Sequence, residues 1–317
     1  MKIIKTLFKI ILGFASLILL ILILDYVRLN ISYLIHKNTY TEEFEIQGNT
    51  SNYVPQGLAY SNKYNIVLQT SYNSKHNVSM LYVIDFETGK LIKDLKLIEI
   101  DDNDNINHVG GITTDENTVW ITNDYEVNEF NLDEIVNTEN DYIKSIKNTK
   151  LPNRGDFCDY NNNILWIGDF FLNPFYKVPD DNPLLMGYNL ENELDYSTPD
   201  YIVSLPKMVQ GMAITEDNKF IFTSSFTNLI QSNLSIYDNV LEDNPEYYNL
   251  NGKEIPYYKF DNTNLIKNIK FPPMIEGLFI KNNLLYILFE NSSDTYFYAY
   301  PKIHKIIKYD IQKANGN

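Results

Sequence analysis

The chain repeats one short plan five times, and this repetition constrains its fold more than any other feature. Each copy has a short apolar strand that begins beside a glycine, then a polar turn, then a second apolar strand. Successive copies are 54, 46, 54 and 66 residues apart, close to the roughly 40–50 residues of a propeller blade. The copies begin at VPQGLAY (54–60), HVGGITT (108–114), RGDFCDY (154–160), VQGMAIT (209–215) and IEGLFIK (275–281).

Two positions of the plan are polar in most copies. In register, the variable position of the first strand is Gln56, Gly110, Asp156, Gln210 and Glu276. The second strands end 13 to 15 residues later, at Ser71, Asp124, Asp169, Ser225 and Glu290. This nearly constant offset indicates a structural repeat.

Third and fourth strands complete the unit. A third apolar strand follows in each copy, and the first ends in the turn DFETGK (85–90). Fourth strands are expected at LIKDLKLI (91–98), YIKSIKNT (142–149), YIVSLP (201–206) and within 255–271, whereas the fifth copy lacks one. TEEFEIQG (41–48), with alternating apolar residues, can supply it and close the ring. The sequence therefore predicts an all-β, five-bladed β-propeller. A six-bladed form with a degenerate blade in 230–275 is the alternative.

Composition supports sheets and excludes one class of partner. The 25 tyrosines and 17 phenylalanines suit strands. The formal charge of the chain is −15, and residues 1–24 hold three lysines and no acid, which leaves −18 on the remainder. Phosphate backbones would repel such a domain, so we expect no nucleic-acid partner. The single cysteine, Cys158, excludes an intrachain disulfide.

The amino terminus predicts a membrane anchor. Ile10–Leu24 is an uninterrupted apolar run preceded by Lys2, Lys5 and Lys9. No small residues or cysteine follow it, which favours an uncleaved signal anchor over a cleaved signal peptide or a lipoprotein. The lysines place the amino terminus in the cytoplasm and the rest outside, as a single-pass protein of the cell membrane. We expect a basic tip and transmembrane anchor at 1–30, a linker at 31–40, the propeller at 41–312 and a tail at 313–317.

Propeller geometry brings the repeated polar positions to one mouth of the central channel. First strands start, and second strands end, on the same face. A concave polar mouth with aromatic walls is the default binding site. The predicted ligand-binding residues are Gln56, Tyr72, His108, Asp124, Arg154, Asp169, Phe170, Gln210, Ser225 and Glu290. Structural roles compete with binding: the amides can bond backbone groups, the aspartates can form turns, and the aromatic side chains can pack between blades.

Two further carboxylates, Asp156 and Glu276, are predicted to point into the same channel. Like charges so placed need a neutraliser. Arg154 could pair with them, a cation such as Ca²⁺ could lie between them, or they could act as general acid and base. The acidic stretch 99–108 lacks the glycine and terminal glutamate of an EF-hand and is expected to be a solvated loop.

With these motifs assembled, the chain resembles a group of secreted or membrane-attached bacterial five-bladed propeller proteins. The resemblance lies in VPQGLAY, NHVGGITT, ILWIGDF, VQGMAIT and 272–293, and it implies a fold and a location but no activity. VPQGLAY and DFETGK are also similar to one blade of plant-type glutaminyl cyclases; the other blades depart from that pattern. Calcium-dependent nucleotidases share only the five-bladed architecture.

The functional prediction is a monomeric, membrane-anchored propeller that binds a small polar ligand, a sugar or peptide, with or without a cation. A hydrolase or lyase acting on surface glycans through Asp156 and Glu276 is the first alternative. A protein-interaction scaffold is the second. The sequence leaves open whether the protein is an enzyme.

Overall fold

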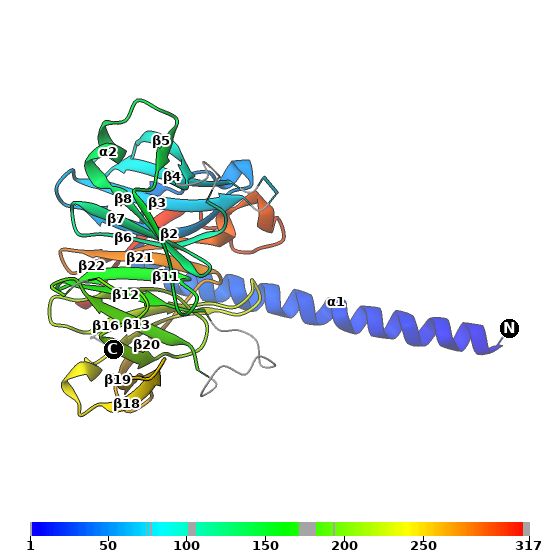
Figure 1. Ribbon diagram of the computed structural model, residues 1–317. Coiled ribbons are helices and arrows are strands. Elements are labelled where there is room, and N and C mark those ends of the chain that lie inside the picture. Colours follow the sequence, from blue (N-terminus) through cyan, green and yellow to red (C-terminus); the bar gives the residue numbers. More distant parts are fainter. Residues whose placement is uncertain are drawn as a thin grey trace.

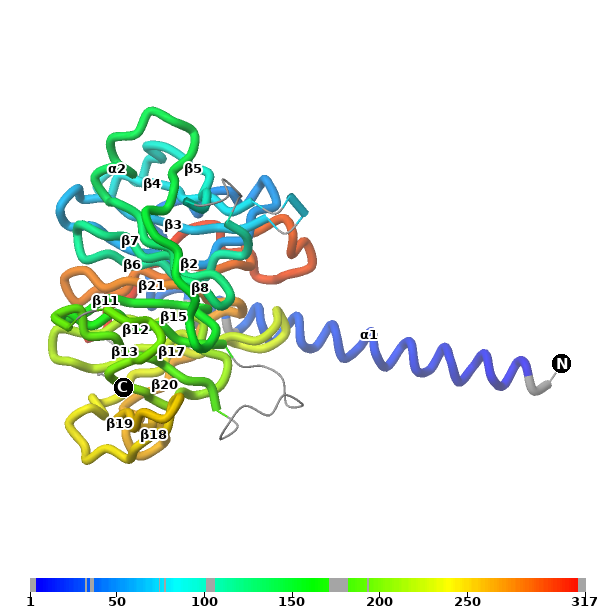
Figure 2. Tube along the Cα trace, viewed as in Figure 1, coloured from blue at the N-terminus to red at the C-terminus, as the bar shows by residue number. Residues whose placement is uncertain are grey.

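Five β-sheets stand around a central channel in the computed structural model, which describes residues 2–73, 75–76, 78–100, 106–170, 182–192 and 194–312. The innermost strands of neighbouring sheets contact one another all the way round, so the ring is closed. The predicted five-bladed propeller is confirmed, and the six-bladed alternative is wrong. Figures 1 and 2 show the blades stacked beside a long amino-terminal helix that projects away from them.

The first two blades follow the predicted order from the channel outward. Blade one contains β2 (Val54–Ser61), β3 (Ile66–Asn73), β4 (Val78–Asp85) and β5 (Leu91–Ile98). Blade two contains β6 (Val109–Thr114), β7 (Thr118–Asn123), β8 (Glu126–Asn131) and β10 (Lys147–Lys150), with α2 (Leu132–Asn137) following β8.

The other three blades repeat this order. Blade three contains β11 (Phe157–Asn161), β12 (Ile164–Gly168), β13 (Leu184–Asn189) and β14 (Tyr201–Ser204). Blade four contains β15 (Val209–Ile214), β16 (Phe220–Ser224), β17 (Ser232–Tyr237) and β20 (Leu265–Phe271). Blade five contains β21 (Ile275–Lys281), β22 (Leu284–Phe289), β23 (Lys305–Asp310) and β1 (Tyr40–Glu45). Single turns of 3₁₀ helix lie at Lys37–Thr39, Asn49–Ser51, Val240–Glu242, Glu290–Ser292 and Asp294–Tyr296.

The amino-terminal strand closes the ring, as predicted. β1 pairs antiparallel with β23, and Tyr40 lies opposite Tyr309. Phe44 and Ile46 are buried, as their alternation with polar neighbours indicated. Joining the first strand of the chain to the last blade covers a sheet edge that would otherwise be exposed.

Two stretches depart from the predicted strands. The stretch 142–149 divides into β9 (Tyr142–Lys144), which pairs in parallel with β5 of blade one, and part of β10. Between β17 and β20, a hairpin of β18 (Glu246–Leu250) and β19 (Lys253–Lys259) leaves blade four and extends blade three through parallel pairing with β14. This hairpin accounts for the longest repeat spacing, which the rival interpretation assigned to a sixth blade.

The glycine that recurs beside the variable position allows the innermost strands to approach closely. A Cβ atom added to Gly277 would lie 2.7 Å from the backbone oxygen of Gln56 and from the nitrogen of Leu58. One added to Gly57 would lie 2.8 Å from the oxygen of Gly110. Because a side chain there would collide with the next strand, glycine sets the radius of the channel.

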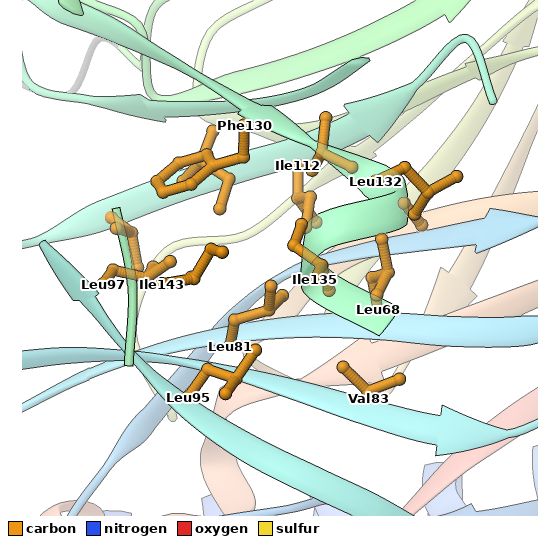
Figure 3. Close-up of a cluster of buried hydrophobic side chains, with 14 of the residues drawn as sticks. Leu68, Leu81, Val83, Leu95, Leu97, Ile112, Phe130, Leu132, Ile135 and Ile143 are labelled. Atoms are coloured by element: carbon orange, nitrogen blue, oxygen red, sulfur yellow. The ribbon is translucent and has the colours of Figure 1, made fainter. Parts of the chain in front are cut away.

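The core lies mostly between blades. The largest cluster joins blades one and two and includes Leu68, Leu81, Ile112 and Phe130. Figure 3 shows Leu132 and Ile135 of α2 covering this cluster. Burying each such side chain contributes about 1.5–3 kcal/mol, so the wedges between blades hold the ring together.

The amino-terminal helix α1 extends from Lys2 to His36 and contains an apolar stretch, Ile4–Ile31, long enough to cross a membrane. Most of its side chains are exposed, whereas Leu29 is buried and Tyr33 packs against a core cluster of blades four and five. The segment 31–40, expected as a linker, is helical as far as His36. The predicted tail, 313–317, lies outside the described residues.

Candidate functional site

A break in strand register directs the polar side chains of the repeat into the channel. In β2, β6, β15 and β21 the pairing with the second strand shifts at the variable position, for example between Pro55 and Leu58 and between Ile275 and Leu278. Such bulges re-aim side chains and are common beside functional sites. In blade three, Asp156 reaches the channel without a bulge, because it precedes β11 by one residue and is not held in the strand pairing.

These side chains meet at one cavity of about 210 Å³ at the mouth of the channel. It brings together eight of the ten predicted ligand-binding residues and both predicted carboxylates. Aromatic rings of Tyr72 and Phe170 form part of the wall. The polar and charged lining residues are Gln56, His108, Asp124, Arg154, Asp156, Gln210, Glu276 and Glu290, joined by Gly110, Gly155 and Tyr296.

The other two predicted residues support the wall from outside the cavity. Ser225 is buried, and its Oγ lies 3.5 Å from the Nε2 of Gln210. Asp169 accepts a 2.7 Å hydrogen bond from the backbone N–H of Leu184, and burial raises its pKa to about 7. Neither side chain belongs to the cavity lining.

The blade-three corner of the cavity is an ion pair. Arg154 Nη2 lies 2.8 Å from Asp156 Oδ1 and 3.2 Å from Asp124 Oδ1. The backbone N–H of Phe170 donates a 2.6 Å hydrogen bond to the other oxygen of Asp156. Burial raises the pKa of Asp156, while the charge of Arg154 acts in the opposite direction. Arg154 therefore pairs with Asp156 and Asp124, whereas one of the three sequence interpretations had it pair with both Asp156 and Glu276.

The blade-five corner has a different arrangement, because Glu276 faces a second carboxyl group. Glu276 is 2% exposed, and its Oε1 accepts a 2.9 Å hydrogen bond from Gln210. Burial raises its pKa well above the ordinary value, and so do the charge of Glu290 and a hydrogen bond with it. Burial also raises the pKa of Glu290, to about 7. Two carboxyl groups this close cannot both ionise cheaply, so they share a proton near neutral pH.

Tyr296 is the member of this corner that sequence reasoning missed. Its hydroxyl bonds Glu290 and thereby opposes the rise in the pKa of that carboxyl group. Tyr296 lies in the long connection after β22, outside the repeated strands, so no register pointed to it. The only sequence signal was the aromatic cluster that follows Glu290, from Tyr296 to Tyr298.

Two aromatic groups complete the mouth. The rings of Tyr72 and His108 lie with centroids 4.3 Å apart. Burial raises the pKa of Tyr72 to about 12, so its hydroxyl stays protonated. His108 has a left-handed backbone with φ 43°, and Met208 and Met274 adopt the same region at the equivalent repeat position. The chain thus enters three of the inner strands through the same turn.

Whether the cavity can bind a metal ion depends on which carboxylate and amide oxygens point into it. Among the residues that the structure describes, no group of three or more His, Cys, Asp or Glu side chains is gathered closely enough to hold a metal ion. The amide Nε2 of Gln56 donates to the carbonyl of Pro55, and that of Gln210 donates to Glu276. The stretch 101–105 of the predicted acidic loop lies outside the described residues.

Comparison with known proteins identifies a fold and no family. No protein-family model and no curated protein matches the chain. Among solved structures, it is similar to a glutaminyl cyclase from Myxococcus xanthus, with a TM-score of 0.50 and 9% identity over 79% of this chain and 90% of that one. It is also similar to a PQQ-bound aldose sugar dehydrogenase from Streptomyces coelicolor, with a TM-score of 0.47 and 13% identity over 85% and 96% of the two chains. At these identities the similarity concerns the fold alone.

Proposed function

We propose that the protein is a membrane-anchored propeller, with its blades outside the cytoplasm, that binds a small polar ligand at the mouth of the channel. The anchor is α1, and Lys2, Lys5 and Lys9 at its start favour a cytoplasmic amino terminus. The observation that carries the proposal is the convergence of polar residues from all five repeats on one cavity.

The chemistry of the lining indicates the class of ligand. Carboxyl and amide groups of Glu276, Glu290 and Gln210 offer both donors and acceptors beside the aromatic ring of Tyr72. The Nε–H of Arg154 is buried without a hydrogen-bond partner, so an acceptor on a ligand or a water would satisfy it. The acidic lining disfavours anions. A neutral or cationic group, such as a sugar or a peptide amine, fits best.

A bound cation belongs to the same proposal. Glu276 and Glu290, with amide oxygens of Gln56 and Gln210 after rotation of the amides, are the ligand types that Ca²⁺ prefers. Ca²⁺ would have to displace the proton that the two glutamates share. Its binding should therefore strengthen as the pH rises through about 7, the pKa of Glu290.

The test is a melting experiment on the full chain in phospholipid nanodiscs. Melting temperature is measured with mono- and disaccharides, with dipeptides, and with Ca²⁺ against EDTA. A ligand at a hundredfold excess over Kd raises stability by about 2.7 kcal/mol. We expect E276Q to abolish the shift and E254Q, a change at an exposed glutamate, to retain it. A ligand that stabilises E276Q and the natural chain equally binds elsewhere and contradicts the proposal.

A hydrolase or lyase acting on glycans is the second candidate, favoured by carboxyl groups whose pKa values are raised towards neutrality. Asp156 and Glu276 were the predicted pair, but Asp156 is already ion-paired with Arg154. Glu276 and Glu290 are within hydrogen-bonding reach, closer than the roughly 5–5.5 Å of retaining or 6.5–9.5 Å of inverting glycosidases. As an acid–base unit they would hold and release one proton. Product formation from a glycan that E290Q abolishes, with binding retained, would favour catalysis over binding alone.

A further inference from the structure

The membrane helix reaches the propeller on the face that carries the cavity mouth. Arg28 Nη2 donates a 2.8 Å hydrogen bond to the carbonyl of Leu229, in the loop after β16. The rings of Tyr26 and Tyr300 lie 4.6 Å apart, and Tyr300 is in the connection after β22. In register, the end of β16 lies opposite the start of β15, and the end of β22 lies opposite the start of β21. These loops therefore adjoin Gln210 and Glu276 at the mouth.

The contact between helix and loops lies close to the apolar span. Arg28 is four residues beyond Leu24, the end of the uninterrupted apolar run, which corresponds to about 6 Å along the helix axis. The headgroup layer on each side of a bilayer is about 5–8 Å thick. The fifteen residues of Ile10–Leu24 cover only about 22 Å of a hydrocarbon core of about 30 Å, so the bilayer extends at least to the end of this run. A membrane that contains α1 thus brings its headgroups to the level of Leu229.

The same two loops expose apolar side chains, which we call the apolar rim. Outside α1, twelve large hydrophobic residues in the described part of the chain are exposed, and five belong to these loops. Phe297 is the most exposed of the twelve, at 84%. Single exposed hydrophobic residues are ordinary, but a cluster beside a membrane helix is typical of an interfacial contact. The apolar rim consists of Phe226, Leu229, Ile230, Phe297 and Tyr298.

We infer that the apolar rim inserts into the headgroup layer of the bilayer that holds α1, so that the cavity receives the polar head of an amphiphile embedded in that bilayer. This inference rests on the proposed anchoring and on binding at the mouth. The remainder of the chain carries −18, so anionic lipids are disfavoured and apolar insertion provides the attachment. The acidic lining selects a neutral or zwitterionic head with a cationic group.

Depth-dependent quenching tests the surface on the full chain in phosphatidylcholine nanodiscs that contain lipid brominated high on the acyl chain. F297W should be quenched at least threefold more than Y247W, because Tyr247 is 65% exposed but lies on the distant β18 hairpin. The two native tryptophans, Trp120 and Trp166, are buried and supply a constant background measured in the natural chain. L229W provides a second reporter if F297W fails to fold. Equal quenching of rim and hairpin reporters would overturn the inference.

A reporter inside the helix separates this inference from the proposed anchoring. L20W lies in the middle of the apolar run and is quenched whenever α1 is in the bilayer. Quenching of L20W without quenching of the rim leaves the anchor intact and refutes the contact of the rim. Absence of quenching at L20W refutes the anchor itself.

Photocrosslinking tests the class of ligand. A benzophenone amino acid replaces Tyr72 in the cavity wall or, as a matched control, the partly buried Tyr64 at the other end of blade one. The full chain is irradiated in vesicles of phosphatidylcholine and phosphatidylethanolamine, and phospholipid adducts are counted by mass spectrometry. We expect at least fivefold more adducts at position 72 than at position 64. Similar yields at the two positions would show that membrane lipid does not enter the cavity.

Discussion

The two acidic corners of the cavity each contain a buried carboxyl group, and they stabilise it in different ways. In blade three, Asp156 lies beside the positive charge of Arg154 and accepts a hydrogen bond from a backbone N–H. In blade five, Glu276 has a carboxyl neighbour, Glu290; the amide of Gln210 donates to Glu276, and the hydroxyl of Tyr296 bonds Glu290. A buried carboxylate needs either a cation or a proton, and the two corners use one each.

The difference divides the mouth into a half with a cation, Arg154, and a titrating half, which consists of Glu276 and Glu290. In blade three, burial raises the pKa of Asp156 and the charge of Arg154 opposes that rise. The pair of Glu276 and Glu290 gains about one negative charge as the pH passes the pKa of Glu290, at about 7. A ligand with a cationic group would therefore bind more tightly on the alkaline side, and blade five would contribute to this response.

The largest expected effect is the pH dependence of stability, which E290Q should reduce. The pKa of Glu290 is raised from 4.5 to about 7 in the folded protein, so the folded state binds the extra proton. Its contribution is fully present below pH 4.5 and is lost as the pH rises to about 7. The free energy of unfolding should fall by up to about 3 kcal/mol more in the natural chain than in E290Q.

Urea unfolding at pH 4.5, 6 and 8 measures this difference. Because Asp156 and Asp169 also have raised pKa values, E290Q should retain part of the pH dependence. E254Q serves as the control with an unchanged profile. An identical profile in E290Q would show that Glu276 and Glu290 do not share a proton.

The next largest effect is expected from R154M, which removes the cation of blade three. Asp156 would remain buried without its partner, and we expect the free energy of unfolding at pH 7 to fall by about 2 kcal/mol. In the D156N background the same change should cost less than half as much, as a double-mutant cycle would show. K96M, at an exposed pair with Asp141, should cost no more than about 0.5 kcal/mol. Equal costs of R154M in both backgrounds would contradict the ion pair.

A smaller effect is expected from Y296F in the titrating half. The hydroxyl of Tyr296 bonds the Glu290 carboxylate and opposes the rise in its pKa. Removing it should raise that pKa further and reduce stability at pH 8 by about 1 kcal/mol. NMR titration of ¹³C-labelled glutamate measures the shift, with the exposed Tyr298 changed to Phe as the control. A lower pKa in Y296F would contradict this role.

The smallest effect is expected from S225A. Ser225 was predicted to bind the ligand, but its Oγ faces Gln210 at 3.5 Å, a marginal hydrogen-bond distance. We expect a change in stability below about 0.5 kcal/mol and unchanged ligand affinity. Q210A, which removes the donor to Glu276, should weaken binding at least tenfold. Comparable losses in the two variants would place Ser225 in the site.

Local pattern predicted the parts of the fold that repeat. The glycine beside each variable position, the constant offset to the end of the second strand, and the alternation in 41–48 led to five blades and a closed ring. These signals worked because every blade must present the same face to its neighbours. The β18–β19 hairpin and β9 were not predicted. Both extend a different blade through parallel pairing, and the local sequence of a strand does not indicate which blade it pairs with.

The candidate site was predicted as a set of residues and not as a set of contacts. Gln56, Gln210 and Glu276 were placed at the mouth because the repeat places them there. The preference of Asp156 for Arg154 and of Glu276 for Glu290 depends on side-chain distances of a few ångströms within one blade. Tyr296 lies in a connection that no repeat describes, so only its position in space reveals its role.

The sequence by itself determined the number of blades, the closure of the ring, the apolar amino-terminal helix and the polar positions at the mouth. These follow from periodicity, which is a local property of the chain. Tertiary structure decided which carboxyl group has a cation, which shares a proton, and on which face the helix meets the propeller. Burial, charge and side-chain geometry set those choices, and the contact of Arg28 with Leu229 joins residues 201 positions apart.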